Sequence, residues 1–68
     1  MINGQVLRRL RIMKGLNQKE AARRLRMSRS TYARLEQSVW LSGEKLQAIL
    51  NALECTSADV EKAMNLLN

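Results

Sequence analysis

The sequence contains no histidine, no proline and no phenylalanine, and only one of its 68 residues is a cysteine. A single thiol cannot form an internal disulfide, and a zinc site built from Cys and His lacks its ligands. Without histidine, a glycine-rich loop or clustered carboxylates, no general base, phosphate cradle or metal cage is evident. We therefore expect a cytoplasmic protein that is not an enzyme and that uses no metal and no cofactor.

Long apolar runs are also missing, since none exceeds three residues, the length reached at 39–41 and 48–50. Neither a membrane span nor the core of a signal peptide is therefore expected. The length predicts one small domain over residues 1–68. Such a domain buries only about 60% of the surface that its unfolded chain exposes, so its core is marginal. A homodimer would support it.

Positive charge is concentrated in the first part of the chain. Residues 1–37 carry ten basic and two acidic side chains, a net charge of +8, whereas residues 38–68 have a net charge of −2. This much charge of one sign destabilises a compact state unless a polyanion neutralises it, which favours nucleic acid as the partner. The alternatives are a solvated basic surface or an anionic membrane, although basic membrane anchors usually carry Trp or Phe on a broad apolar face.

The sequence contains five signals for the start of a helix. Each has a capping residue with one apolar residue directly before it and another four positions after it. These caps are Asn3, Asn17, Ser28, Ser42 and Thr56. Gly15 is placed to end the first helix in a left-handed conformation. Because strand patterning is absent, the sequence predicts an all-α fold with helices over residues 4–14, 18–25, 29–36, 43–53 and 57–66.

The second and third predicted helices are separated by three residues only, which is helix-turn-helix spacing. Two helices that cross so closely need a small residue at their contact, and Ala22 lies at that point. An ordinary helical hairpin has the same short turn, so spacing alone leaves both interpretations open.

In addition to this spacing, the identities of several residues resemble those of the phage repressor and Cro family of DNA-binding domains (lambda-repressor-like, XRE-type). The matching residues are Leu10-Arg11, 15–22 (GLNQKEAA), 27–32 (MSRSTY), Leu35-Glu36 and 52–55 (ALEC). The resemblance covers about residues 5–60. It implies a five-helix domain whose third helix enters the major groove, bound as a dimer to a two-fold symmetric operator. Two residues depart from the family pattern: Arg26 stands where the turn usually has Gly, and Tyr32 where an aliphatic residue is usual.

The implied docking assigns roles to side chains. Arg29, Ser30 and Arg34 are predicted to contact bases, since Arg is the side chain best shaped to grip guanine; phosphate neutralisation is the alternative. Gln18, at the positive start of the second helix, is predicted to touch a phosphate. The further candidates for the DNA backbone are Asn17, Lys19, Arg11, Thr31 and Ser38, and a thymine methyl is the alternative partner for Thr31.

Two predictions concern the fold and the assembly. Arg11 and Glu36 occupy the positions of an ion pair that resembling proteins use to tie the first helix to the third, and we expect it to be largely buried. The last helix carries more apolar surface than a chain end needs, which favours a symmetric dimer through the second half of the chain. The dimer candidates are Trp40, Leu41, Val60, Met64 and Leu67. Trp40 could instead cap the core or lie along the DNA backbone.

The favoured function is a sequence-specific regulator of transcription that binds double-stranded DNA, in particular a dimeric repressor of the phage, plasmid or mobile-element type. Two alternatives have the same fold: a restriction-modification controller and an antitoxin that represses its own operon. From another class, an RNA-binding or protein-interaction module would show no preference among duplex sequences.

Overall fold

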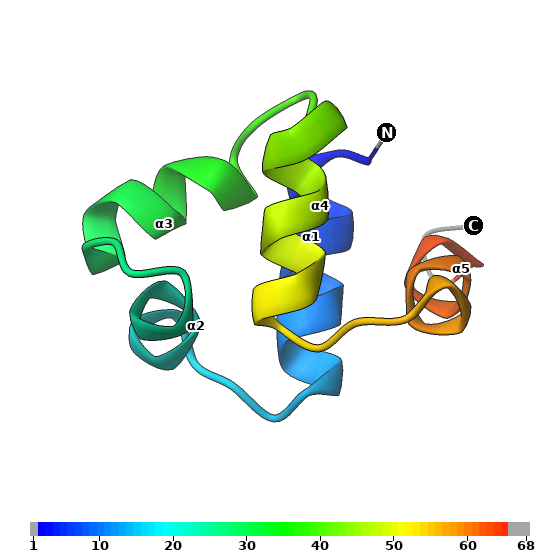
Figure 1. Cartoon of the computed structure of the whole chain (residues 1–68), viewed down its shortest axis with the longest axis horizontal. Helices are drawn as coiled ribbons and strands as arrows, with labels where there is room; N and C mark the ends of the chain where they lie inside the picture. Colours follow the sequence, from blue (N-terminus) through cyan, green and yellow to red (C-terminus); the bar gives the residue numbers. More distant parts are fainter. Residues whose placement is uncertain (1, 66–68) are drawn as a thin grey trace.

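The computed structural model describes residues 2–65, which form five α-helices (Figure 1). They are α1 (Gly4–Met13), α2 (Gln18–Arg24), α3 (Arg29–Glu36), α4 (Gly43–Ala52) and α5 (Ser57–Asn65). The all-α prediction is confirmed. Within these residues, each helix starts at the residue that was predicted for it. The first, second and fourth predicted helices end one residue later than the observed ones. The one β-type contact among residues 2–65 is an isolated bridge between Ile2 and Leu41.

Side-chain caps start most of the helices. Asn3 accepts the Val6 N–H at 3.0 Å, and Asn17 and Glu20 form a reciprocal capping box at the start of α2. Ser28 and Thr56 cap α3 and α5 in the same way. Ser42 forms no such bond. The residue after it, Gly43, has φ +65°, so the chain enters α4 through a left-handed residue instead of the usual capped geometry.

Three helices end in the same left-handed turn. The residue two positions after the end of the helix has positive φ, and the next amide bonds back to the third-last helical carbonyl, as in a Schellman motif. Gly15, with φ +71°, fills this position after α1, as predicted. Arg26 after α2 and Glu54 after α4 fill it with φ +57°. For a residue with a Cβ atom, the left-handed conformation costs about 1 kcal/mol, so neither Arg26 nor Glu54 favours the backbone conformation that it adopts.

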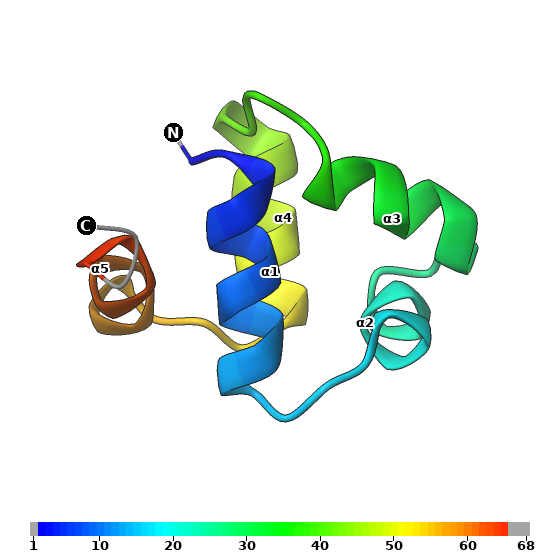
Figure 2. The same cartoon turned by 180° about the vertical axis from the view of Figure 1, so that it is seen from behind.

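The two helices of the helix-turn-helix pack against each other, and α3 also packs against α1. Ala21 and Ala22 are buried on α2, and Tyr32 and Leu35 are buried on α3, where they join Leu7 and the rest of the α1 core. In Figures 1 and 2, α2 and α3 lie on one side of α1 and α5 lies on the other.

Gly4 brings the start of α1 against the end of α3. A Cβ atom at this position would overlap the carbonyl oxygen of Glu36 and would lie 2.6 Å from that of Leu35. The Gly4 N–H donates to the Ser38 carbonyl at 2.8 Å. The close approach of two backbones therefore sets the position of the last turn of α3.

On the opposite side, α5 packs on α1. Ala63 is buried in the contact, and Val60 is half-buried against the core. The Lys14 Nζ lies 3.0 Å from Asp59 Oδ2 and joins the end of α1 to the first turn of α5. This ion pair is partly exposed, so packing, more than charge, holds α5 in place.

Candidate nucleic-acid interface

Helix α3 has one buried and one exposed side. Tyr32 and Leu35 face the core, whereas Arg29, Ser30 and Arg34, the predicted base contacts, are all exposed. Ser30 and Arg34 are four residues apart and so lie on one side of the helix. The exposed side of α3 therefore offers guanidinium and hydroxyl groups to a partner.

The start of α2 lies next to the first turns of α3. Gln18 borders a shallow hollow with Arg29, Ser30 and Ala33, and a neighbouring hollow with Asn17, Lys19 and Arg29. The predicted backbone contacts Asn17, Gln18 and Lys19 are thus brought together with two of the predicted base contacts. We call the surface formed by residues 17–19, 29, 30 and 34 the α2–α3 face.

Arg11 and Glu36 lie together beneath this face. The Arg11 Nε lies 2.6 Å from Glu36 Oε2, and the two side chains are only 11% and 5% exposed. Arg11 also donates to the Leu16 carbonyl at 2.8 Å. Burial opposes the ionisation of Glu36, but hydrogen bonds from Arg11 and Gln18 outweigh it and hold the carboxyl pKa below its usual value. The pair therefore ties α1 to the end of α3 with both groups charged.

The Gln18 side chain is already engaged in the free protein. Its Nε2 donates to Glu36 Oε1 at 3.1 Å, so the amide nitrogen that was expected at a phosphate is turned toward α3. Glu36 thus holds Arg11 from α1 and Gln18 from α2 at once, a three-helix junction that sequence reasoning missed because Gln18 has no charge to suggest a partner.

The Tyr32 ring is completely buried, and its hydroxyl oxygen has no hydrogen bond of good geometry among the described residues. The hydroxyl lies beside the Glu36–Arg11 pair. Burial raises the pKa of Tyr32, and the Glu36 carboxylate raises it further, so the phenol stays neutral. Tyr32 therefore fills the core in place of an aliphatic residue, with its hydroxyl directed at the polar junction.

The other predicted backbone contacts lie at the two ends of α3. The Thr31 hydroxyl accepts from Ser28 Oγ at 2.8 Å within the N-terminal cap, and Thr31 is exposed. The Ser38 hydroxyl donates to the Arg34 carbonyl at 3.1 Å. Both hydroxyls support the helix that they flank.

The dimer candidates are divided between core and surface. Leu41 is only 4% exposed and pairs with Ile2, so its assignment to an interface is wrong: it belongs to the core of its own chain. Trp40 is 67% exposed, which excludes burial in the core of the chain. Met64 is also exposed. The fifth candidate, Leu67, lies outside the described residues.

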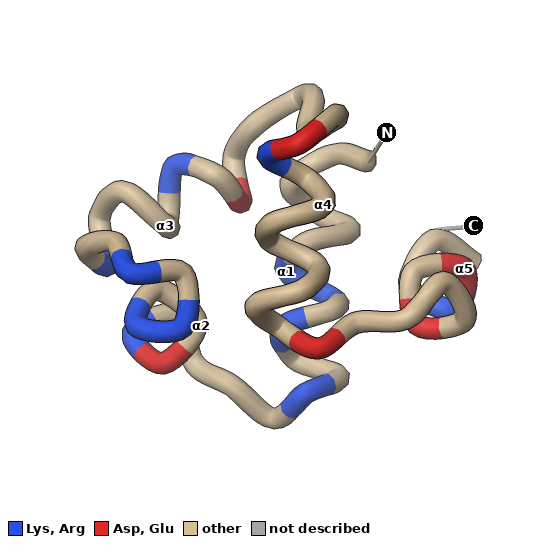
Figure 3. Tube along the Cα trace, viewed as in Figure 1, with Lys and Arg blue, Asp and Glu red and all other residues tan. Residues whose placement is uncertain are grey.

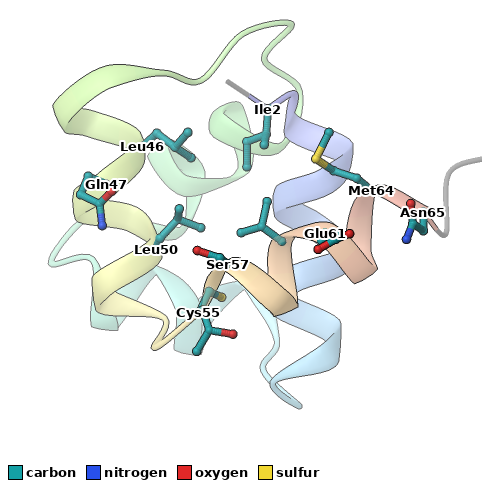
Figure 4. Close-up of a pocket in the computed structure, with 11 residues that line it drawn as sticks. Ile2, Leu46, Gln47, Leu50, Cys55, Ser57, Glu61, Met64 and Asn65 are labelled. Atoms are coloured by element: carbon teal, nitrogen blue, oxygen red, sulfur yellow. The ribbon is translucent and has the colours of Figure 1, made fainter.

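A hollow between α4 and α5 is lined by both apolar and polar residues, and Glu61 is among the polar ones. Ile2, Leu46 and Leu50 line it, together with Val60 and Met64 (Figure 4). We call these five residues the α4–α5 groove. It contains two of the dimer candidates, Val60 and Met64.

Charge separates these two surfaces. Figure 3 shows Lys and Arg gathered on α2 and at the turn into α3, whereas two of the three charged residues of α5, Asp59 and Glu61, are acidic. Glu36 at the end of α3 is paired with Arg11. Among residues 2–65, Lys19, Arg29 and Arg34 of the α2–α3 face form no ion pair, so this face keeps a net positive charge.

Within residues 2–65, no helix is long and apolar enough to cross a membrane. No group of three His, Cys, Asp or Glu side chains in this range is placed to hold a metal ion.

Comparison with known proteins agrees with the geometry. A family model described as helix-turn-helix matches residues 7–60, which include all of α2, the turn and α3. Searches of curated proteins and of solved structures gave no match. The match covers most of the sequence, and the chain belongs to the XRE-type, Cro/C1-like helix-turn-helix family of DNA-binding transcription regulators.

Proposed function

We propose that the protein is a sequence-specific repressor, of the phage, plasmid or mobile-element type, that binds a palindromic operator as a dimer. The observation that carries this proposal is the exposed side of α3, where Arg29, Ser30 and Arg34 project from a helix whose other side is buried. A helix of this kind fits the major groove, where each base pair presents a distinct set of donors and acceptors.

Base contacts are proposed for Arg29, Ser30 and Arg34. A guanidinium can donate two parallel hydrogen bonds to guanine O6 and N7, and a serine hydroxyl can contact several bases. Arg29 is at the first position of α3, the end of a recognition helix that faces base edges.

Backbone contacts are proposed for Asn17, Gln18, Lys19, Thr31 and Ser38. Asn17, Gln18 and Lys19 line the hollows beside Arg29, so a phosphate next to the groove that admits α3 would lie within their reach. The hydrogen bond that Gln18 donates to Glu36 orients the Gln18 side chain before DNA binds, which lowers the entropy lost on binding.

A symmetric dimer is proposed through the α4–α5 groove and the exposed Trp40. Two copies that share a two-fold axis bury the same groove against each other. The second half of the chain supports this arrangement, since its net charge of −2 creates little repulsion between copies. A dimer would place two α3 helices about 34 Å apart, one turn of duplex DNA.

Selection of bound duplexes from a random pool tests the proposal. We expect a two-fold symmetric consensus with half-sites one helical turn apart. Enrichment without any consensus would contradict sequence-specific recognition. Retention of single-stranded RNA or of proteins in place of duplex DNA would point to an RNA-binding or protein-interaction module.

A further inference from the structure

The turn between α2 and α3 contains an arginine in a conformation that favours glycine. Arg26 has φ +57° and occupies the same position in its turn as Gly15 does after α1. Its N–H bonds to the Arg23 carbonyl, and the Met27 N–H bonds to the Ala22 carbonyl, both within 3.1 Å. The backbone therefore uses the left-handed residue for the turn and has no need of the side chain.

The Arg26 side chain has no polar partner among the described residues of the free protein. It is exposed, and within residues 2–65 it forms no ion pair and no side-chain hydrogen bond; the two ion pairs found there are Arg11–Glu36 and Lys14–Asp59. Arg23 and Arg24, also exposed, lie two and three positions before it. Three guanidinium groups within four residues repel one another, so this site carries both backbone strain and charge repulsion.

The position of this cluster indicates which anion it serves. Figure 3 shows the basic residues continuing from the end of α2 through the turn to the start of α3. Arg29, the first residue of α3, is three positions after Arg26. Phosphates line both edges of the groove that the start of α3 is proposed to enter, so a cation in this turn lies beside one of those edges.

We propose that Arg26 contacts a DNA phosphate, in addition to the contacts assigned to the α2–α3 face. This inference rests on the proposed function, because the phosphate belongs to the duplex that α3 reads. The contact adds affinity without sequence preference. The strain and the repulsion in the turn are then the cost of a side chain that acts only in the complex.

Four variants separate this contact from an effect on folding. Arg26→Gly and Arg26→Asn remove the charge but keep a residue that accepts positive φ. Arg26→Lys keeps the charge. Glu54→Gly is the matched control, because it relieves the same strain in the same kind of turn after α4.

Thermal unfolding and duplex binding are measured for each variant across a range of salt concentration. We expect Arg26→Gly to raise the melting temperature and yet to weaken binding about tenfold for each bound protomer at 0.1 M salt, since each phosphate contact contributes about 0.9 to the log-log salt slope. Arg26→Asn should weaken binding equally, to operator and random duplex alike, while Arg26→Lys keeps the slope. Glu54→Gly should raise the melting temperature without weakening binding.

Three results would overturn the inference. Arg26→Gly and Arg26→Asn could bind as the unaltered protein does, with the same salt slope. Their loss of affinity could be confined to the operator, which would indicate a base contact. Arg26→Gly could lower the melting temperature, which would make Arg26 a structural residue. Failure of the proposed function is distinct: the unaltered protein would then bind no duplex at all.

Discussion

Replacing individual side chains at the two ends of α3 should have the strongest effects on DNA binding and on folding stability. Arg29 and Arg34 are exposed and free to meet DNA, whereas Glu36, two residues after Arg34, is buried and bonded to two other helices. In this eight-residue helix, the exposed residues are therefore available to bind DNA, and the buried residues support the fold.

Replacing Arg29 or Arg34 with Ala should reduce operator affinity by about 1 to 3 kcal/mol and relax the preference at one base position. Neither side chain supports the core, so the free energy of unfolding should stay nearly unchanged. Binding to operator and to random duplex, measured at fixed salt, checks this. An equal loss on both duplexes would mean that the arginine contacts phosphate instead of a base.

Replacing Glu36 with Ala should lower the free energy of unfolding by about 3 to 5 kcal/mol, because Arg11 is left charged and buried without its partner. Urea unfolding measures the loss. The double variant Arg11→Met, Glu36→Leu is the control, since it removes both charges and should lose much less. An unchanged unfolding midpoint for Glu36→Ala would show that the pair behaves like an exposed one, which contributes under about 1 kcal/mol.

At the scale of helices and turns, local signals in the sequence were sufficient to predict where helices start. Contacts between residues distant in the sequence could not be predicted from such signals. The caps at Asn3, Asn17, Ser28 and Thr56 could be predicted because each acts on its own helix within three residues. Ser42 carries the same signal, but the left-handed Gly43 after it overrides the cap. The separation of exposed Trp40 from buried Leu41 depends on the pairing with Ile2, and no periodic pattern reveals it.

The contact of α1 with α3 at Gly4 belongs to this scale, because it exists only when both helices are in place. Gly4→Ala would press a methyl group into the backbone of Glu36 and Leu35. We expect the free energy of unfolding to fall by about 2 to 3 kcal/mol, as the helices must move apart to admit the methyl. Chemical denaturation checks the value. Gly15→Ala, where nothing lies within 4 Å of the added Cβ, isolates the cost of the left-handed backbone and should lose only about 1 kcal/mol.

The whole molecule presents two surfaces of different character on opposite sides of α1. Basic residues are gathered on α2 and at the turn into α3, and the α4–α5 groove lies beside α5 (Figures 3 and 4). One surface suits a polyanion and the other suits a second copy of the chain, so the two functions need not compete for the same residues.

Sedimentation equilibrium on the free protein should give a dimer mass at tens of micromolar. Met64→Glu should shift the mass toward that of the monomer, because it replaces an apolar residue of the groove by a second carboxylate close to Glu61, which also lines the hollow. Lys62→Glu is the control, since it changes charge at an exposed position on the same helix outside the residues that line the groove. A monomer mass that Met64→Glu leaves unaltered would rule out a dimer formed before DNA binds.

The pairing of Ile2 with Leu41 joins the first residues of the chain to the loop that follows α3. The two backbones exchange hydrogen bonds of 2.9 and 2.7 Å, and both side chains are buried. Fraying of the amino-terminal segment therefore releases the loop that carries Trp40, and the amides of Ile2 and Leu41 should exchange hydrogen with solvent as one cooperative unit. A purification tag attached at the carboxyl end leaves this unit intact, whereas deletion of residues 1–3 removes it together with the Asn3 cap of α1.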